Sequence, residues 1–247
     1  MFNLVVDIGN TFSKVAVFKD RQILELEVSE NLSADHLAGW FQKYPLSNAV
    51  LSTVRKDAGE PGAFLQSRCR YIEFSTKISA GIINHYKTPS TLGLDRYAAV
   101  IGAKALLPER DCLVIDAGTC ITYDFIDSKG NYWGGSISPG IGMRFRAMNT
   151  FTGRLPLIEF DESFQEEYGL DTADALLSGV NNGIFFEVKG FIEQYSRNWP
   201  QAKVLLCGGD VNFFDRRLKN SIFAASIKAE PNLVLIGLNE VIHQYND

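Results

Sequence analysis

The chain has 247 residues, of which 46% are hydrophobic and 21% charged, a balance that predicts one large or two moderate folded domains and excludes a disordered chain. The net charge of −5 argues against nucleic acid as the main partner, because binding its phosphates requires a basic surface. Residues 1–10 lack a basic segment ahead of their apolar run, and no apolar run is long enough to cross a bilayer, so we expect neither a secretion signal nor a membrane span.

The first part of the chain is expected to form strands and helices in turn. Alternating apolar and polar residues predict the strands, and apolar residues spaced by three and four predict the helices. Ser33 is expected to cap the first helix, and Trp40 and Phe41 to lie in the core. In chain order the expected elements are strands at 3–7, 12–18 and 22–28, a helix at 33–44, a strand at 48–53, a helix after Asp57, a strand at 70–75 and a helix at 95–107.

A similar pattern then starts again in the second part of the chain. The expected elements are a strand, turn and strand within 111–127, a strand at 132–138, helices at 141–150 and 171–198, strands at 203–210 and 221–227, and a final helix at about 232–245.

The cysteines and histidines do not form a metal-binding pattern. The four cysteines lie far apart without a C-x-x-C pair, and the three histidines have no metal-ligand spacing. We therefore expect buried, reduced thiols in a cytoplasmic protein. These residues are Cys69, Cys112, Cys120, Cys207, His36, His85 and His243.

An internal repeat underlies the second start of the pattern. When Asp7 is set on Asp116, the stretch LVVDIGN (4–10) aligns with LVIDAGT (113–119), so each copy is a hairpin that bends at Asp-x-Gly. We therefore expect an α/β protein of two duplicated halves, residues 1–108 and 109–247, with a cleft between them.

A carboxylate at the end of an apolar strand is costly to bury unless a partner balances its charge. An aspartate that only caps a turn would explain one such bend, but two copies favour a binding role. Glycine lets backbone N–H groups approach a ligand, and successive N–H groups form a cradle for an anion. Asn10, Thr11, Ser13 and Thr119 add polar groups, and Lys14 adds a positive charge, although a lysine on a hairpin is more often just solvated. Two such loops facing each other can hold a triphosphate and its cation, although there is no Walker loop.

Paired hairpins with DIGN and DAGT at their bends resemble the phosphate loops of the actin, sugar kinase and Hsp70 ATPase fold. The resemblance implies a duplicated ribonuclease H-like (actin-like ATPase) fold, with two mixed-sheet halves around a cleft. It makes residues 7–14 the first phosphate loop and residues 116–124 the second. Gly208-Gly209-Asp210, which follows an apolar strand, stands where that fold contacts adenosine.

Four longer motifs resemble type III pantothenate kinase over essentially the whole chain: DIGNTFSK (7–14), TLGLDRYAAVIGA (91–103), DAGTCITYD (116–124) and GGSISPGIGMRFRAM (134–148). The resemblance implies a cytoplasmic kinase that uses ATP with Mg²⁺ to phosphorylate pantothenate to 4'-phosphopantothenate, the first step of coenzyme A biosynthesis. It also implies a homodimer and activation by a monovalent cation, K⁺ or NH₄⁺.

The same resemblance implies roles for individual residues. Asp95 matches the catalytic base, Asp116 matches the ligand of the monovalent cation, and Thr172 matches a substrate contact that comes from the other subunit. The implied ATP-binding residues are Asp7, Ile8, Gly9, Asn10, Thr11, Phe12, Ser13, Lys14, Thr119, Gly208 and Gly209. The implied substrate-binding residues are Tyr86, Gly93, Leu94, Asp95, Arg96 and Thr172.

Several residues also have a simpler explanation from the residue pattern alone. An ionised carboxylate can accept the proton of an attacking hydroxyl, but Asp95 precedes an alanine-rich helix and is also a candidate N-cap. Arg96 is consistent with a pair to Asp95, with binding of a substrate carboxylate, or with a surface arginine. Asp124 is consistent with a cation ligand or a solvent-facing strand carboxylate. Gly134 and Gly135 are consistent with close approach to a ligand or with tight turns.

Two other functions remain open at this point. A small-sugar or N-acetylhexosamine kinase of the same fold would keep both phosphate loops, but it would normally have a larger sugar-binding insertion and often a zinc-binding cysteine cluster, neither of which is seen. A non-catalytic regulatory protein is the other alternative, because some relatives of the family are labelled transcription accessory factors. The acidic balance and the presence of Asp95 count against it.

Overall fold

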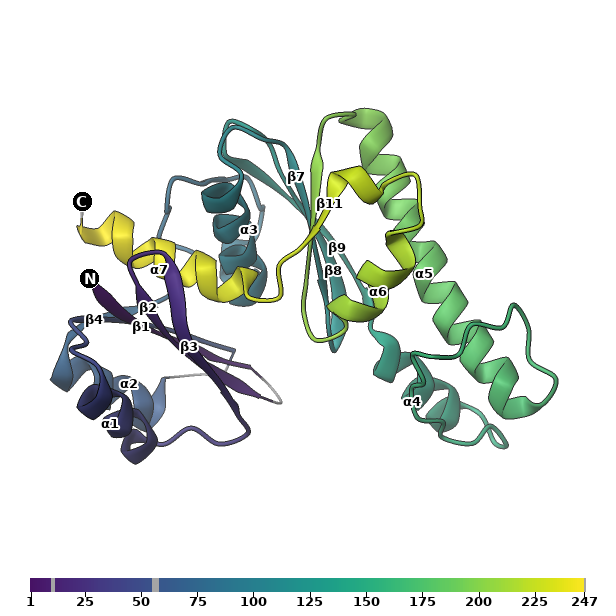
Figure 1. The fold of residues 1–247 in the computed structure, drawn as a ribbon, viewed down its shortest axis with the longest axis horizontal. Coiled ribbons are helices and arrows are strands. Elements are labelled where there is room, and N and C mark those ends of the chain that lie inside the picture. Colours follow the sequence, from purple (N-terminus) through teal and green to yellow (C-terminus); the bar gives the residue numbers. More distant parts are fainter. Residues whose placement is uncertain (10–11, 55–57, 247) are drawn as a thin grey trace. The chain divides into compact units, whose positions relative to one another are not determined.

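The computed structural model describes residues 1–9, 12–54 and 58–246. It divides into two compact units, each with its own sheet (Figure 1). Unit 1 comprises Met1–Pro108, Gly130–Tyr132 and Asn232–Asp247, and unit 2 comprises Glu109–Lys129 and Trp133–Pro231. The chain therefore leaves unit 1 after Pro108, returns to it briefly at 130–132, and returns again for its last helix. The assignment of residues 1–108 and 109–247 as two ligand-binding halves stays a prediction.

Unit 1 is built on a five-stranded mixed sheet. Its strands β1 and β2 form the first Asp-x-Gly hairpin, β3 continues it antiparallel to β2, and β4 and β5 are added in parallel on the other side of β1. The strand order is β3 (Gln22–Ser29), β2 (Ser13–Lys19), β1 (Phe2–Ile8), β4 (Asn48–Thr53) and β5 (Arg70–Glu73).

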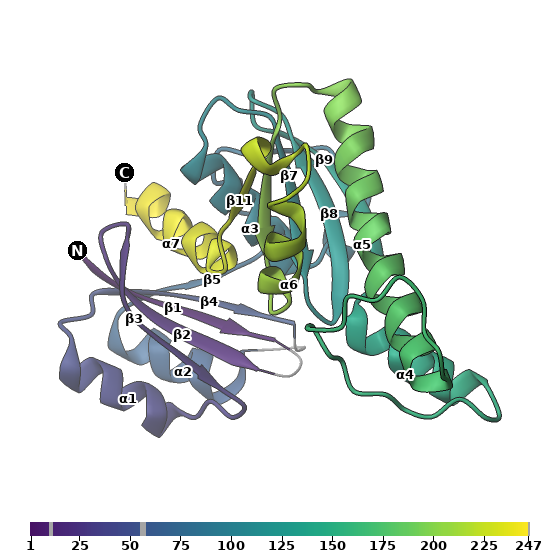
Figure 2. The ribbon, with the colours of Figure 1, turned by 45° about the vertical axis from the view of Figure 1, so that its right-hand side comes forward.

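Helices α1 (Ala34–Lys43) and α2 (Gly59–Arg68) cover one face of this sheet (Figure 2). The face is apolar because alternate residues of β1 and β2 point to the same side, so that Leu4 and Val6 pack with the α1 residue Trp40. The expected N-cap of α1 is confirmed, since the Ser33 hydroxyl accepts a hydrogen bond from the backbone N–H of His36 (3.2 Å).

Helix α7 (Leu233–Asn246) lies against β1 and β4, and α3 (Leu94–Leu106) packs along α7. The two helices approach closely because each has a glycine at the contact. A Cβ atom on Gly102 would clash with the Leu233 carbonyl oxygen, and one on Gly237 with the Ala98 carbonyl oxygen. Strand β6 (Ile83–Asn84) and the short 3₁₀ helix η1 (Pro89–Thr91) lie before α3, and β6 pairs in parallel with Asn131 and Tyr132.

Unit 2 contains the second Asp-x-Gly hairpin, formed by β7 and β8. The strand order is β11 (Ile227–Ala229), β10 (Lys203–Cys207), β7 (Cys112–Ala117), β8 (Cys120–Ile126) and β9 (Asn131–Pro139). Strand β10 runs parallel to both β7 and β11. The order of these five strands matches that of the first sheet, as the repeat predicts, and the second sheet has a sixth strand, β6, beside β9.

Three helices share one core with the sheet of unit 2. They are α4 (Ile141–Phe151), the long α5 (Thr172–Asn198) and α6 (Val211–Leu218). Apolar residues of all three, such as Phe145, Ile184 and Phe214, pack with alternate residues of β7 and β10. In the described part of the chain no helix is both long and apolar enough to cross a membrane.

The strand expected at 221–227 is wrong. These residues form a turn and the 3₁₀ helix η2 (Ala224–Ser226), and the strand begins only at Ile227. The serine hydroxyls stabilise this turn by binding nearby carbonyl oxygens, Ser221 to Leu218 (2.7 Å) and Ser226 to Phe223 (2.7 Å). Ile222, whose apolar side chain favoured a strand, is 89% exposed. Helix α6 was not expected.

Candidate active site

The first phosphate loop connects β1 to β2, and Asp7 lies close to its start. Gly9 is held in a tight bend by a hydrogen bond from its N–H to the Phe12 carbonyl oxygen (3.0 Å), and a Cβ atom there would lie 2.8 Å from that oxygen. Ile8 and Ser13 are buried, whereas the Phe12 side chain is half exposed. Asn10 and Thr11, both expected to contact ATP, lie outside the described residues.

The carboxyl group of Asp7 has an unusual electrostatic environment. Burial and, to a smaller extent, the negative charge of Asp95 raise its pKa from 3.8 to about 6, although Lys14 and the Ser52 hydroxyl act in the opposite direction. The first loop and the start of α3 therefore meet within unit 1, and they bring two carboxylates and one lysine together. Such a carboxylate pair favours a bound cation, because the cation would offset the repulsion between the charges.

Asp95 lies in the first turn of α3 rather than at its cap. The N-cap is Gly93, so the interpretation of Asp95 as the N-cap is wrong. The Asp95 carboxylate instead accepts a hydrogen bond from the backbone N–H of Arg96 (2.8 Å). A Cβ atom on Gly93 would lie 2.5 Å from Oδ1 of Asp95, so glycine leaves room for this carboxylate.

Arg96 and Tyr86 are also brought together beside Asp95. The Arg96 guanidinium lies over the Tyr86 ring, 5.6 Å from its centroid, and Tyr86 stacks on the buried Tyr132 with the ring centroids 6.3 Å apart. Arg96 is only 5% exposed, which excludes the surface arginine considered above. Leu94, which begins α3, is half-buried. The four-residue motif 93–96 thus presents a carboxylate and a stacked guanidinium on a single helix turn.

The second phosphate loop follows β7, and the Gly-Gly turn after β10 packs against it. A Cβ atom on Gly208 would lie 2.5 Å from Oδ1 of Asp116, and the backbone of Gly208 has a φ of +91°, so both space and conformation require glycine. The N–H of Asp210 donates to the Ala117 carbonyl oxygen (2.9 Å), and burial raises the pKa of the Asp210 carboxyl. Thr119 and Gly209 are exposed. Parallel pairing of β10 with β7 produces this contact.

Each loop aspartate has a hydroxyl opposite it in the sheet. Ser52 is the register partner of Asp7 on β4, and Thr122 is the register partner of Asp116 on β8. Within the described part of the chain, both hydroxyl oxygens are buried without a hydrogen-bond partner of normal geometry. An unsatisfied buried oxygen beside a carboxylate fits a cation ligand. The sequence motifs did not indicate Ser52, whereas Thr122 lies within the second loop motif at 116–124 but was not assigned a role there.

Other predicted residues have different surroundings. Asp124 is 1% exposed, which overturns the solvent-facing alternative. Gly134 and Gly135 lie within β9 and not in tight turns, and a Cβ atom on Gly135 would clash with the Tyr123 carbonyl oxygen. Thr172 begins α5, is exposed, and lines a cavity of about 410 Å³ with Leu155, Gly169, Leu170, Asp171, Ala175 and Leu176.

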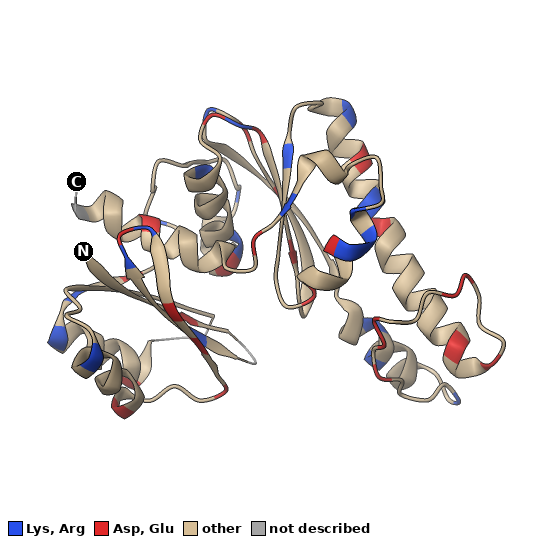
Figure 3. Cartoon of the chain, in the orientation of Figure 1, with Lys and Arg blue, Asp and Glu red and all other residues tan. Residues whose placement is uncertain are grey.

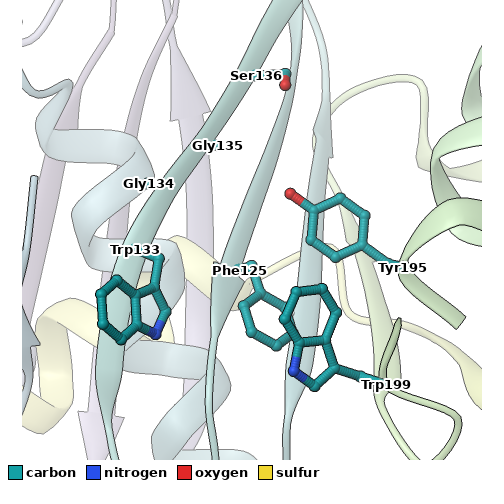
Figure 4. Close-up of a pocket in the computed structure, with 7 residues that line it drawn as sticks. All are labelled: Phe125, Trp133, Gly134, Gly135, Ser136, Tyr195 and Trp199. Atoms are coloured by element: carbon teal, nitrogen blue, oxygen red, sulfur yellow. The ribbon is translucent and has the colours of Figure 1, made fainter. Parts of the chain in front are cut away.

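A second cavity in unit 2, of about 400 Å³, has a mostly aromatic lining (Figure 4). Phe125, Tyr195 and Trp199 pack against one another on one side: Tyr195 stacks on Trp199, and the tilted rings of Phe125 and Trp199 have their centroids 4.2 Å apart. Its other lining residues are Trp133, Gly134, Gly135 and Ser136. None of the residues expected to bind ATP or substrate lines it.

Comparison with solved structures identifies the fold. A chain from Campylobacter jejuni, suggested to be a Baf family transcriptional activator, has a TM-score of 0.64 and 21% identity over 98% of both chains. The activator of 2-hydroxyisocaproyl-CoA dehydratase from Clostridium difficile, with bound ADPNP, has a TM-score of 0.55 and 13% identity over 100% of this chain and 97% of that one. A suggested N-acetylmannosamine kinase from Listeria monocytogenes has a TM-score of 0.59 and 14% identity over 100% of both chains. The chain is therefore an α/β protein of the actin-like ATPase and sugar kinase fold.

Sequence comparison then identifies the family. The family model described as type III pantothenate kinase matches residues 3–194. A type III pantothenate kinase of Phocaeicola vulgatus is 42% identical over 246 residues, which cover 99% of this chain and 99% of that protein. One of Flavobacterium johnsoniae is 39% identical and covers 98% of this chain and 97% of its own length. This chain belongs to the type III pantothenate kinase family.

Proposed function

We propose that this chain transfers the γ-phosphoryl group of ATP to the primary hydroxyl of pantothenate, with Asp95 as the proton acceptor. The product is 4'-phosphopantothenate, and the reaction is the first step of coenzyme A biosynthesis. Family membership supports the reaction, and the proximity of Asp7 to Asp95 is the structural observation that carries the assignment of roles. In phosphoryl transfer the protein mainly positions the reactants and stabilises charge, and it needs a group to receive the hydroxyl proton.

Each loop is proposed to contact ATP phosphates through groups of its own unit. Backbone N–H groups around Gly9 and Thr119 donate to phosphate oxygens, and Lys14 adds a positive charge. The Asp7 carboxylate would hold the divalent ion that accompanies ATP, and its raised pKa and the unsatisfied Ser52 hydroxyl fit that role. When bound, Mg²⁺ neutralises phosphate charge that builds up during transfer. The described residues contain no group of three or more His, Cys, Asp or Glu side chains that could hold a metal without substrate.

Asp116 is the residue proposed to hold a monovalent cation. The carboxylate supplies one oxygen ligand, and the unsatisfied Thr122 hydroxyl opposite it supplies a second. Potassium or ammonium would satisfy both groups. The adjacent turn at Gly208 and Gly209 is proposed to contact adenosine, because it packs directly on this loop.

Pantothenate is proposed to bind beside the start of α3. Its carboxylate suits the Arg96 guanidinium, which is held in place over Tyr86, and its primary hydroxyl is directed to Asp95. We further propose a cytoplasmic homodimer in which Thr172 of one subunit contacts the substrate of the other. The exposed position of Thr172 in the lining of a cavity supports this role. Acidic and basic residues are interspersed in both units (Figure 3), which suits a small-molecule substrate better than nucleic acid.

A coupled assay with ATP and pantothenate tests the function. Asp95→Asn is expected to lower kcat by at least about a hundredfold, in line with loss of a general base, while binding of a non-hydrolysable ATP analogue persists. Asp35→Asn is the matched control, because Asp35 is an exposed carboxylate at the same position in the first turn of α1. Phosphorylation of hexosamines but not of pantothenate would support the sugar-kinase alternative. Nucleotide binding without turnover of either acceptor would support a regulatory protein.

A further inference from the structure

A carboxylate on α5, Glu187, connects three other elements of unit 2. Its Oε1 accepts hydrogen bonds from the hydroxyl groups of Tyr123 on β8 (2.9 Å) and Ser138 on β9, and its Oε2 pairs with the Arg144 guanidinium on α4. Tyr123 is fully buried, and Arg144 and Glu187 are half-buried. A single side chain on α5 therefore determines how β8, β9 and the first turn of α4 are arranged. This role is distinct from the residues that the phosphate motifs indicate.

The network is electrostatically satisfied. Burial by itself would raise the pKa of Glu187, but hydrogen bonds from Ser138, Arg144 and Tyr123 outweigh it and hold this pKa below its ordinary value. Glu187 is therefore ionised at neutral pH. A charge-assisted bond to Arg144 in a partly buried setting is stronger and better oriented than an exposed ion pair.

Arg144 extends this network to the end of β9. Its Nε donates to the Pro139 carbonyl oxygen (2.9 Å), while Nη2 of the same planar group binds Glu187. The guanidinium therefore joins the last residue of β9 to α5. Because Gly140 follows Pro139 and is the N-cap of α4, the point at which α4 begins is fixed by this bridge.

The start of α4 lies directly on the second phosphate loop. The N–H of Gly140 donates to the Thr119 carbonyl oxygen (3.1 Å), and a Cβ atom on Gly140 would clash with the carbonyl oxygen of Gly118. One helical turn later, the Met143 sulfur lies 3.8 Å from the Cys120 thiol. Residues 118–120 are thus in contact with α4 on both sides of Thr119. A shift of α4 must move this loop, because Gly140 has no space to spare.

We propose that Glu187 is a positioning residue for the second phosphate loop, and that it acts through Arg144 and Gly140 on Thr119. The inference rests on the proposed role of Thr119 as an ATP contact. Loss of the Glu187 charge would release Arg144, allow the start of α4 to move, and misplace the backbone groups that receive the phosphates. The acceptor site should be much less affected, because the residues assigned to it at 86 and 93–96 belong to unit 1, and Thr172, at the start of α5, lies fifteen residues before Glu187. The expected defect is therefore in nucleotide binding.

The test compares Glu187→Gln with the wild-type enzyme. Glutamine has the same shape and retains an oxygen acceptor, but it loses the charge paired with Arg144. We expect the KM for ATP and the dissociation constant of ADPNP to rise roughly 3- to 30-fold, and the KM for pantothenate to change less than about twofold, a range typical of couplings through packed neighbours. Arg144→Met is expected to have the same effect. The double variant should be no worse than the weaker-binding single variant, because both changes break one path.

Glu193→Gln is the matched control, since Glu193 is on the same helix and its pair with Arg197 is exposed. It should leave both KM values unchanged. Unchanged ADPNP affinity in a folded Glu187→Gln variant would overturn the proposal, as would a parallel loss in both KM values. If Glu187→Gln unfolds, Ser138→Ala removes one bond of the network and tests the same split. The ADPNP titration measures nucleotide binding without any acceptor. If the wild-type enzyme bound ADPNP but did not phosphorylate pantothenate, the proposed function would be refuted, and the titration would still test the role of Glu187.

Discussion

Replacement of Asp7 by asparagine is expected to stabilise the protein while abolishing its activity. The Asp7 carboxyl has a pKa of about 6 in the folded chain against 3.8 ordinarily, because burial and the charge of Asp95 disfavour its ionised form. Above pH 6 the folded state must therefore hold an ionised carboxylate in an unfavourable site. Asparagine is nearly isosteric and uncharged, so it removes this penalty and also removes the proposed Mg²⁺ ligand.

The magnitude follows from the pKa difference. A shift of about two units corresponds to about 3 kcal/mol, since each pKa unit is worth 1.36 kcal/mol. The sign is set by linkage. A raised folded-state pKa contributes stability that is fully present below the unfolded pKa and lost as the pH rises through the folded pKa. The gain from Asp7→Asn should therefore be largest above pH 6, shrink between pH 6 and pH 4, and almost vanish below pH 4.

Thermal unfolding of the two proteins, without Mg²⁺ and at pH 4, 5, 6 and 8, measures this gain. At pH 8 we expect the Tm of the transition that contains unit 1 to rise by roughly 5 to 10 °C. Asp20→Asn is the control, because Asp20 is exposed in the same unit and its pairing with the N-terminal amine holds its pKa below the ordinary value. It should not stabilise the protein at pH 8. A pH-independent gain, or a loss at pH 8, would refute the assignment of a strained carboxylate at position 7.

Three further predictions use the same site. The kcat/KM for ATP should fall as the pH drops through about 6, because the free enzyme must ionise Asp7 to bind the divalent ion. The acidic fall in kcat, which reports on the bound enzyme, should occur at lower pH. If kcat and kcat/KM fell at the same pH, Asp7 would not be the group responsible. Activity should rise with K⁺ or NH₄⁺ and be weak in Na⁺ alone, and Asp116→Asn should abolish this difference; equal wild-type rates in K⁺ and Na⁺ buffers would remove Asp116 as a monovalent site. Gly140→Ala should raise the KM for ATP and destabilise unit 2 by about 1–3 kcal/mol, because the added methyl group would clash with the Gly118 carbonyl oxygen. Gly153→Ala is the control, because Gly153 has open space around it, and it should change neither urea unfolding nor ATP kinetics.

The parts of the fold with a strong local pattern could be predicted from the sequence. Most strands and long helices begin and end within a few residues of their expected bounds, because side-chain period and punctuating glycines determine them locally. Helix α6 escaped prediction because it has only eight residues, three of them charged. The false strand at 221–227 shows the reverse case, in which an apolar run is overridden by serine hydroxyls that stabilise a turn.

The candidate site could likewise be predicted only in part from the sequence. Residues that adjoin in sequence, such as Gly93, Asp95 and Arg96, could be recognised as one motif. The neighbours that set their chemistry could not, because register and packing bring them together. Ser52 faces Asp7 only through the parallel pairing of β1 with β4, and Glu187 reaches Arg144 across two helices. Periodicity likewise marks 233–246 as a helix without indicating that it packs in unit 1.

The strands that pair in parallel with the two hairpins differ in the residue opposite the loop aspartate, and this difference yields a last prediction. In equivalent parallel pairings, Asp7 is opposite Ser52 whereas Asp116 is opposite Cys207. Only the first copy thus has a hydroxyl on this side of the aspartate, and this hydroxyl lowers the pKa of Asp7. Ser52→Ala should raise that pKa by up to about one unit, because this hydroxyl no longer favours the ionised carboxylate, and should shift the acidic limb of kcat/KM upward. Ser47→Ala, on the exposed approach to the same strand, should leave the limb in place. A limb that stays fixed or moves to lower pH in Ser52→Ala would show that Ser52 does not tune this carboxylate.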